Sequence, residues 1–359
     1  FVYAAALQSR MLNADSNVPD VPMVIRNPKT HGIYAPGNYA AGFGGQSTMV
    51  TALAKSRNLS AVWTYQHIDP YADEDVVYQF VRGLGIGGAP LHHMPATAVE
   101  NPDDNRLCRW VDAKHPDAVA CQAPPVPGVG QTFRDAAPSG EACRMCDLTI
   151  GLGSASLTPA EMTGAYAAFA NGGIYVEPYI IEEVRDRHGN TLEKHRAEPP
   201  FQAMAPEVAT IMTWLLQKVV TQGTARLATA LGVDVAGKTG TTNDWRDAWF
   251  IGYTPDVVTS VWVGFDKPRT MAYNATGGHT ALPLWVDYMK NVAERSRGHS
   301  FPVWGNVVWK GDFPYVNGVL SEVSWLDLLF PGEIAEPTVS DQIMFMPAVP
   351  EITDVGTDL

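Results

Sequence analysis

The densest structural signal in the sequence lies at residues 237–255, which read GKTGTTNDWRDAWFIGYTP. Together with the residues on either side, it predicts three neighbouring strands over 233–241, 247–253 and 257–265. The breaks between these strands are short, and Thr254-Pro255-Asp256 supplies the turn between the second and the third. Because strands joined by short turns pair in opposite directions, we expect an antiparallel sheet around this stretch.

Helical patterns flank this group of strands on both sides in the sequence. We expect helices over 1–11, 48–67, 73–84, 159–171, 206–221 and 284–296. The helix at 159–171 begins with a capping box, Thr158-Pro159-Ala160-Glu161, which satisfies amides of its first turn. A strand at 174–184 leads through a turn, Arg187-His188-Gly189-Asn190, into a second strand at 191–195. The expected fold class is α/β of the α+β type, with a central antiparallel sheet flanked by helices.

The composition is that of a folded protein. Hydrophobic residues make up 46% of the 359 residues and charged residues 18%, which is enough apolar material for a core. The net charge of −13 argues against a nucleic-acid-binding surface, which needs clustered Lys and Arg. No apolar run approaches the ~18 residues that a membrane span requires. The sequence starts with Phe and shows no signal peptide, so we expect a fragment whose anchoring segment lies outside it.

Two regions differ from the rest in composition. Residues 89–147 are rich in proline, lack sustained periodicity and hold the cysteines Cys108, Cys121, Cys143 and Cys146. This pattern predicts an inserted, loop-rich subdomain held by disulfides or by zinc, for which three histidines are further candidate ligands: His92, His93 and His115. Residues 311–359 contain nine acids and no Lys or Arg, which predicts an acidic appendage after a main domain at 1–310.

The chemistry of the 237–255 stretch is concentrated in Lys238-Thr239-Gly240-Thr241. Side chains alternate along a strand, but twist and an edge position can direct the ammonium group and both hydroxyls toward one site. The glycine lets a ligand lie close to the backbone. Such a strip suits a carboxylate ligand. The alternative is a solvated edge strand on which the lysine blocks aggregation.

The same stretch closely resembles the third active-site motif of class A penicillin-binding proteins, the bifunctional enzymes that polymerise and cross-link peptidoglycan. Three further blocks are similar to the transpeptidase domain of that family. They are Tyr34-Ala35-Pro36-Gly37-Asn38-Tyr39, the stretch 52–62 with a Ser-x-Asn motif at Ser56-Arg57-Asn58, and residues 152–159 with 166–167 and 170–173. The resemblance covers most of residues 1–300 and implies the transpeptidase fold shared with serine β-lactamases.

The family's first motif, Ser-x-x-Lys, is missing from the sequence. No serine here is followed by lysine three residues later, and residues 1–7 resemble the helix directly after that motif. The resemblance therefore implies that the sequence is truncated just behind its catalytic serine and lysine. We expect this chain to be inactive by itself, since a serine nucleophile needs a nearby base.

The resemblance assigns roles to the residues of the other two motifs. Ser56 is expected to relay protons, and Asn58 to bind the amide of the substrate. Lys238 supplies positive potential, while Thr239 and Thr241 hydrogen-bond the terminal carboxylate. The backbone amide of Thr241 is the expected oxyanion donor. The alternative for Ser56 and Asn58 is an ordinary polar loop.

Two further assignments concern the residues that surround these polar groups. Gly240 is expected to let substrate approach the strand. Trp245 can belong either to the wall of the site or to the core, whereas Trp249 is expected in the core. Tyr34 and Asn38 can serve simply to order their loop.

The activity implied is that of a D,D-transpeptidase on the outer face of the bacterial inner membrane. It acts through a seryl acyl-enzyme on stem peptides ending in D-Ala-D-Ala, binds β-lactams, and uses no cofactor or active-site metal. Thiols oxidise in that compartment, so two disulfides are expected among the four cysteines, with zinc and free thiols as alternatives. The alternative functions are a catalytically silent peptidoglycan-binding scaffold and a related carboxypeptidase or β-lactamase.

Overall fold

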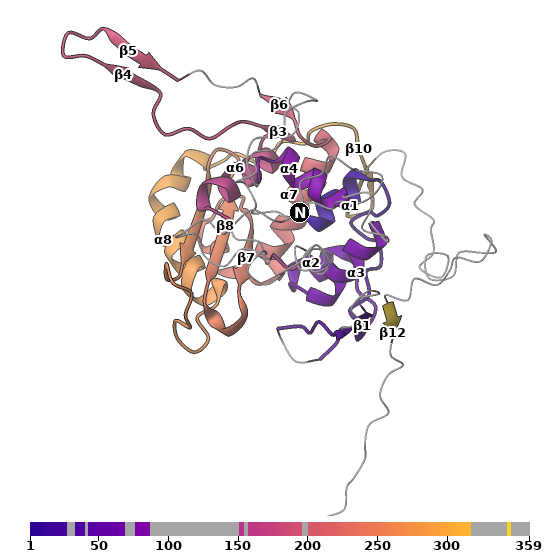
Figure 1. Ribbon diagram of the computed structural model, residues 1–359. Helices are drawn as coiled ribbons and strands as arrows, with labels where there is room; N and C mark the ends of the chain where they lie inside the picture. The colour runs from indigo at the N-terminus through magenta and orange to yellow at the C-terminus, as the bar shows by residue number, and fades with distance from the viewer. Residues whose placement is uncertain are drawn as a thin grey trace, which may run out of the picture.

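The computed structural model describes residues 1–26, 33–39, 42–68, 76–86, 151–153, 157–195, 200–316 and 343–345 (Figure 1). Its helices are α1 Val2–Gln8, α2 Met49–Ala54, α3 Asn58–Ile68, α4 Val76–Gly83, α6 Pro159–Ala170, α7 Pro206–Gln222 and α8 Leu282–Val292. Shorter helical turns are η2 Arg226–Leu231, η3 Asn243–Trp245, η4 Gly277–Ala281 and η5 Ala293–Ser296. The predicted insert at 89–147, with its cysteines and histidines, lies outside the described residues.

The central sheet consists of three antiparallel strands, β7 Ala236–Thr241, β8 Ala248–Tyr253 and β9 Val258–Val263, which neighbour each other in sequence order. The register places Lys238 opposite Ile251. Short connections between β-rich segments favour this pairing. The antiparallel sheet predicted around the 237–255 stretch is therefore confirmed.

Side chains of β8 contact different helices on the two faces of this sheet. The ring of Phe250 meets Trp285 of α8 edge-on, with 4.9 Å between ring centroids. Tyr253, on the opposite face, contacts the ring of Tyr166 on α6 and the hydroxyl of Thr213 on α7. Helix α8 thus covers one face, and α6 and α7 cover the other (Figure 1). The predicted sheet flanked by helices is confirmed.

Helix α1 lies among α3, α4 and α7 and forms part of the core. All of its residues from Val2 to Leu7 are buried. The ring of Phe1, just before the helix, stacks on Phe169 and meets Tyr166 edge-on, which fastens α1 to α6. The buried helix predicted at the start of the sequence is confirmed.

The capping box predicts the start of α6 correctly. The hydroxyl of Thr158 accepts a hydrogen bond from the Glu161 amide, and the Glu161 carboxylate accepts one from the Thr158 amide. Pro159 follows at the first helical position, where its missing N–H leaves no bond unmade. The helix begins where the box places it because these local bonds satisfy its first turn.

The single helix predicted over 48–67 is wrong, because the structure has two helices there, α2 and α3. Between them Ser56 adopts a left-handed backbone conformation with φ of 53°. The Arg57 amide turns back to donate to the carbonyl of Ala52, which ends α2. The apolar pattern runs through this turn, so periodicity alone does not reveal it.

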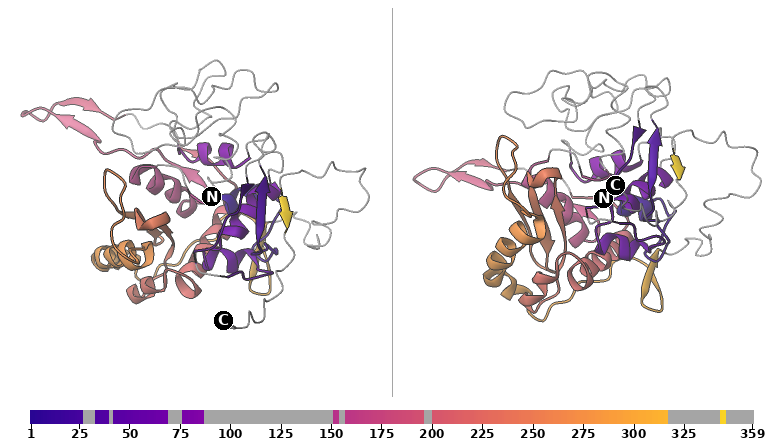
Figure 2. Two further views of the ribbon diagram at one scale, coloured as in Figure 1. Left: turned by 60° about the horizontal axis from the view of Figure 1, so that its bottom comes forward. Right: turned by 90° about the horizontal axis from the view of Figure 1, so that it is seen from below.

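The strand predicted over 174–184 is also wrong. Only its ends are strands, β3 Ile174–Tyr175 and β4 Glu183–Arg185. Pro178 lies between them and has no N–H for a ladder bond. The predicted hairpin after them is confirmed: β4 pairs with β5 Thr191–Lys194 and stands away from the rest of the described chain (Figure 1, Figure 2).

The remaining strands form small sheets. They are β1 Met23–Arg26, β2 Ile33–Tyr34, β6 Phe201–Gln202, β10 Val307–Lys310, β11 Phe313–Val316 and β12 Ile343–Phe345. From the predicted acidic appendage, the described part includes β12, which pairs with β1 (Figure 2). In the part of the chain that the structure describes, no helix has both the length and the apolar character needed to cross a membrane.

Candidate active site

The Ser-x-Asn motif occupies the turn between α2 and α3. Asn58 is the first residue of α3, and its side-chain amide donates to the carbonyl of Gly37 over 2.8 Å. Its backbone amide donates to the side-chain oxygen of Asn38 over 3.0 Å. Asn38 therefore does more than order its own loop, because it also fixes the beginning of α3.

Lys238 on β7 and Ser56 meet although they are 182 positions apart in the sequence. The Lys238 ammonium donates to the Ser56 hydroxyl over 2.8 Å and to the carbonyl of Thr239 over 2.9 Å. The second and third motifs of the predicted site are thus brought into direct contact because α2 and β7 both pack against α7.

The surroundings of Lys238 disfavour its charged form. Desolvation lowers the pKa of Lys238 to about 8. In the 359-residue chain, burial and, to a smaller extent, the charge of Lys238 lower the pKa of the Phe1 α-amino group to about 6. The start of α1 therefore lies within electrostatic reach of the Ser56–Lys238 pair.

The two threonines of β7 share one face of the strand, because side chains alternate along it, but their hydroxyls have different partners. The Thr239 hydroxyl lies 2.7 Å from that of Thr224, just after α7. The exposed Thr241 hydroxyl accepts from the amide of Gly277 over 3.0 Å and keeps its own proton free to donate. Of the two, Thr241 has the geometry expected for a group that meets a ligand.

Gly277 allows the backbone of η4 to lie directly against β7. A Cβ atom on Gly277 would come within 2.4 Å of the Gly240 carbonyl oxygen and 2.3 Å of that of Trp249. Only glycine fits such an approach. A Cβ atom on Gly240 itself would meet only the side chain of Trp249, at 3.1 Å, so the expected approach of a ligand at Gly240 stays a prediction.

Trp245 joins an aromatic group near the end of β7. Its indole N–H donates to the Tyr39 hydroxyl over 2.9 Å, and its ring meets Tyr273 edge-on at 5.1 Å. Both tyrosines are exposed. Trp249, in contrast, packs against the hydrophobic core as expected. Sequence reasoning missed Tyr273, whereas the block ending in Tyr39 held a signal for its partner.

Among the described residues, no three His, Cys, Asp or Glu side chains lie together in a way that could hold a metal ion. The four cysteines lie outside those residues, so the choice between disulfides and zinc stays a prediction.

These contacts unite motifs that the sequence separates, and comparison with known proteins gives the same assignment. A family model described as penicillin binding protein transpeptidase domain matches residues 1–290. The chain belongs to this family. This transpeptidase domain contains the second and third motifs in contact, as the resemblance implies.

Relatives of this transpeptidase domain are much longer proteins. Penicillin-binding protein 1A from Neisseria meningitidis serogroup B is 32% identical over 315 residues, which is 86% of this chain and 32% of that protein. Penicillin-binding protein 1A from Aquifex aeolicus is 40% identical over 153 residues, 43% of this chain and 21% of that protein. The chain spans about a third of the length of the Neisseria relative.

Solved structures share the fold. Penicillin-binding protein 1A from Haemophilus influenzae superposes with a TM-score of 0.64 at 23% identity, over 86% of this chain and 43% of that one. PonA1 from Mycobacterium tuberculosis gives 0.60 at 22% identity, over 88% and 72%. The expected fold class, a penicillin-binding protein transpeptidase fold, is confirmed.

Proposed function

We propose that this domain serves a D,D-transpeptidase reaction that cross-links peptidoglycan stem peptides ending in D-Ala-D-Ala. The observation that carries the proposal is the 2.8 Å contact between Lys238 Nζ and Ser56 Oγ. It joins a hydroxyl that can pass on a proton to an amine with a pKa of about 8, which exchanges protons near neutral pH.

The proposed reaction has two acyl-transfer steps. A serine hydroxyl attacks the carbonyl carbon of the penultimate D-Ala, the peptide bond breaks, and the terminal D-Ala leaves with a proton. An amine of a neighbouring stem peptide then attacks the ester, and the serine regains its proton. Ser56 and Lys238 pass the proton to the leaving amine, and Asn58 binds the substrate amide.

The terminal carboxylate of the substrate is the group that β7 would hold. Lys238 supplies the positive potential, and the Thr241 hydroxyl donates a hydrogen bond. The Thr239 hydroxyl contacts that of Thr224, and we assign Thr239 a weaker hydrogen bond to the substrate carboxylate than Thr241. The Thr241 amide is the proposed oxyanion donor, Gly240 keeps this part of the strand open, and Trp245 borders the site.

β-Lactams carry the same carboxylate and an acylating carbonyl, so they are proposed ligands of this site. PonA1 from M. tuberculosis has been solved in complex with penicillin V, at 22% identity and a TM-score of 0.56. Penicillin-binding protein A from the same organism has been solved as an imipenem acyl-enzyme complex, at 21% identity and 0.53. We place the domain on the outer side of the inner membrane, where its cysteines form disulfides.

The test is acylation by penicillin, followed by intact mass. The 359-residue sequence holds no Ser-x-x-Lys, so it should gain no penicilloyl adduct. A version that carries a relative's Ser-x-x-Lys helix ahead of Phe1 should gain one, and its Ser→Ala variant none. Failure of the extended version to acylate would overturn the proposal in favour of a silent binding module.

Lys238→Ala in the extended version tests the role of the contact itself. A charge-assisted hydrogen bond contributes ~1.5–3 kcal/mol, so acylation should slow at least about tenfold. Lys290→Ala is the matched control, since Lys290 is exposed and pairs with Asp287 on α8. Equal acylation rates for the two variants would contradict the role given to Lys238.

A further inference from the structure

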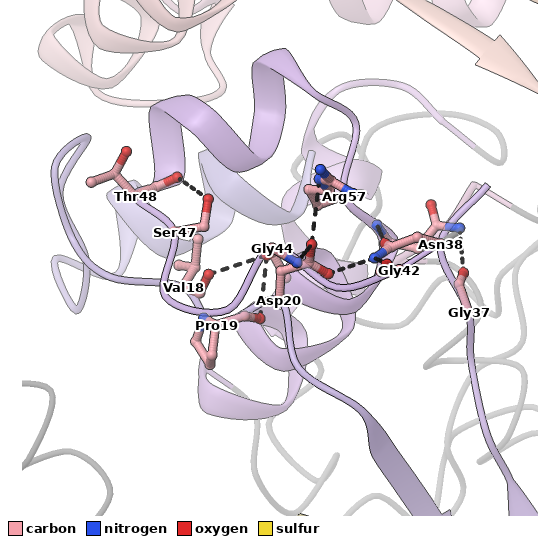
Figure 3. Close-up of polar contacts among 12 residues, drawn as sticks. Val18, Pro19, Asp20, Gly37, Asn38, Gly42, Gly44, Ser47, Thr48 and Arg57 are labelled. Carbon is pink, nitrogen blue, oxygen red and sulfur yellow. Dashed lines mark hydrogen bonds and ion pairs between the residues drawn. The ribbon is translucent and has the colours of Figure 1, made fainter. Parts of the chain in front are cut away.

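A buried carboxylate lies behind the Ser-x-Asn motif. Asp20 has no solvent exposure, and its side chain lies at the centre of a group of polar contacts (Figure 3). Its Oδ1 accepts from the Asn38 side-chain amide over 2.6 Å, and its Oδ2 accepts from the Gly44 amide over 2.8 Å. Arg57 Nε lies 3.3 Å from the same Oδ2. A buried carboxylate is costly unless such partners compensate it.

The segment that bears Asp20 is itself held tightly. The buried Ser60 hydroxyl on α3 lies within hydrogen-bond distance of the carbonyls of Val18 and Pro19, at 3.1 and 3.2 Å. Asp20 also exchanges both backbone hydrogen bonds with Gly45. A Cβ atom on Gly44 would come within 2.9 Å of Asp20 Oδ2, so a side chain there would displace the carboxylate or the loop.

The contacts of Asp20 reach the catalytic motif from two directions. Arg57 is the middle residue of Ser56-Arg57-Asn58, and it pairs with Asp20 directly. Asn38 binds Asp20 with its side-chain N–H and accepts from the Asn58 amide with its oxygen, over 3.0 Å. Figure 3 shows Arg57 and Asn38 on two sides of the carboxylate. The residues after Ser56 are thus fixed to a rigid, buried anchor.

The turn at Ser56 needs an anchor of this kind. A residue other than glycine at φ of 53° is in an unfavourable conformation, which persists only where the surrounding contacts determine it. If Arg57 and Asn58 were released, the backbone at Ser56 could relax toward ordinary helical angles. The Ser56 hydroxyl would then move away from Lys238.

We propose that Asp20 is a positioning residue that holds the Ser56 hydroxyl at Lys238 Nζ. It acts through Arg57 and through Asn38, and it does not touch the reacting groups. This role rests on the proposed transpeptidase function. The competing interpretation is that Asp20 only fastens the loop at 42–47 to the fold.

The first experiment measures geometry in the 359-residue chain and so does not depend on activity. Asp20→Asn keeps the size and the acceptor oxygen of the side chain but removes the charge that faces Arg57. A crystal structure of this variant should show Ser56 out of its left-handed conformation and its contact with Lys238 lost. An unchanged turn with an intact 2.8 Å contact would overturn the proposal.

The second experiment measures acylation in the version extended by a Ser-x-x-Lys helix. Asp20→Asn should slow acylation per folded molecule by about tenfold to a hundredfold, because small displacements near the reacting groups have effects of that size. Ser296→Ala is the matched control, since it removes a fully buried hydroxyl that bonds to Thr254, outside these contacts. Equal acylation rates in Asp20→Asn and Ser296→Ala would mean that Asp20 only stabilises the fold, and would overturn its role in positioning Ser56.

Arg57→Gln provides an independent test if Asp20→Asn fails to fold. The Arg57 side chain is 27% exposed, so its loss is easier to tolerate than that of the buried acid. Arg57→Gln should slow acylation in the same way. The double variant Asp20→Asn/Arg57→Gln should be slower than Arg57→Gln alone only by the part of the Asp20 effect that passes through Asn38. If the fold-decreases in acylation rate of the two single variants simply multiply in the double variant, Asp20 does not act through Arg57. Absence of acylation in the unmutated extended version would instead refute the transpeptidase proposal, and the crystal structure would still decide the role of Asp20.

Discussion

Lys238 Nζ and Ser56 Oγ lie 2.8 Å apart, and this contact joins the central sheet to the turn between α2 and α3. Desolvation lowers the pKa of Lys238 to about 8, from 10.5 for an ordinary lysine. The amine therefore changes charge within the pH range in which the protein can be assayed.

The first prediction concerns pH. In the extended version, Lys238 attracts the penicillin carboxylate only as a cation, so the acylation rate should fall as pH rises through about 8. The unfolded chain retains this proton to higher pH, so the cost of burying Lys238 decreases, and the free energy of unfolding rises, as pH increases from about 8 to 10. The decline therefore cannot be assigned to unfolding caused by Lys238. Lys238→Arg should abolish the decline, whereas an identical profile in that variant would contradict the assignment.

A second prediction concerns the link between Tyr39 and Trp245. Tyr39→Phe removes the oxygen that accepts from the indole N–H at 2.9 Å. We expect the free energy of unfolding to decrease by ~0.5–1.5 kcal/mol and amides of η3 to exchange faster. Urea unfolding and hydrogen exchange measured by mass spectrometry give both values. Tyr288→Phe, at an exposed tyrosine on α8, is the control and should change neither.

A third prediction concerns the start of α6. Thr158→Ala removes the hydroxyl that accepts from the Glu161 amide, which should decrease the free energy of unfolding by ~1 kcal/mol. Thr221→Ala is the control, because that hydroxyl bonds within the last turn of α7 and caps nothing. If chemical denaturation gives the same midpoint for both variants, the capping box does not contribute as described.

A fourth prediction concerns the cysteines at 108, 121, 143 and 146. Two disulfides should each stabilise their region by ~2–4 kcal/mol, because they restrict the unfolded chain. Thiol titration of protein produced in an oxidising compartment, denatured without reductant, should find no free thiol and no zinc. Four thiols released together with one zinc ion would reverse the assignment and weaken the proposed location.

Elements with local signals could be predicted from the order of the residues. The capping box at Thr158 and Glu161 gives the start of α6, and the 237–255 stretch gives a sheet with its turns. These predictions succeed because caps, turns and the alternation of a strand depend on residues a few positions apart. The same locality explains the two wrong predictions, where an apolar pattern continued through the turn at Ser56 and through Pro178.

The assembly of the site, in contrast, depends on how the whole chain folds. The fold brings Ser56 to Lys238, joins the Thr239 hydroxyl to that of Thr224, and places Asp20 behind the Ser-x-Asn motif. No local pattern encodes these relationships, since each joins segments that are distant in sequence. They arise because burying the apolar faces of α1, α2 and α7 fixes the positions of the polar turns between them, and a left-handed Ser56 is tolerated only within those contacts.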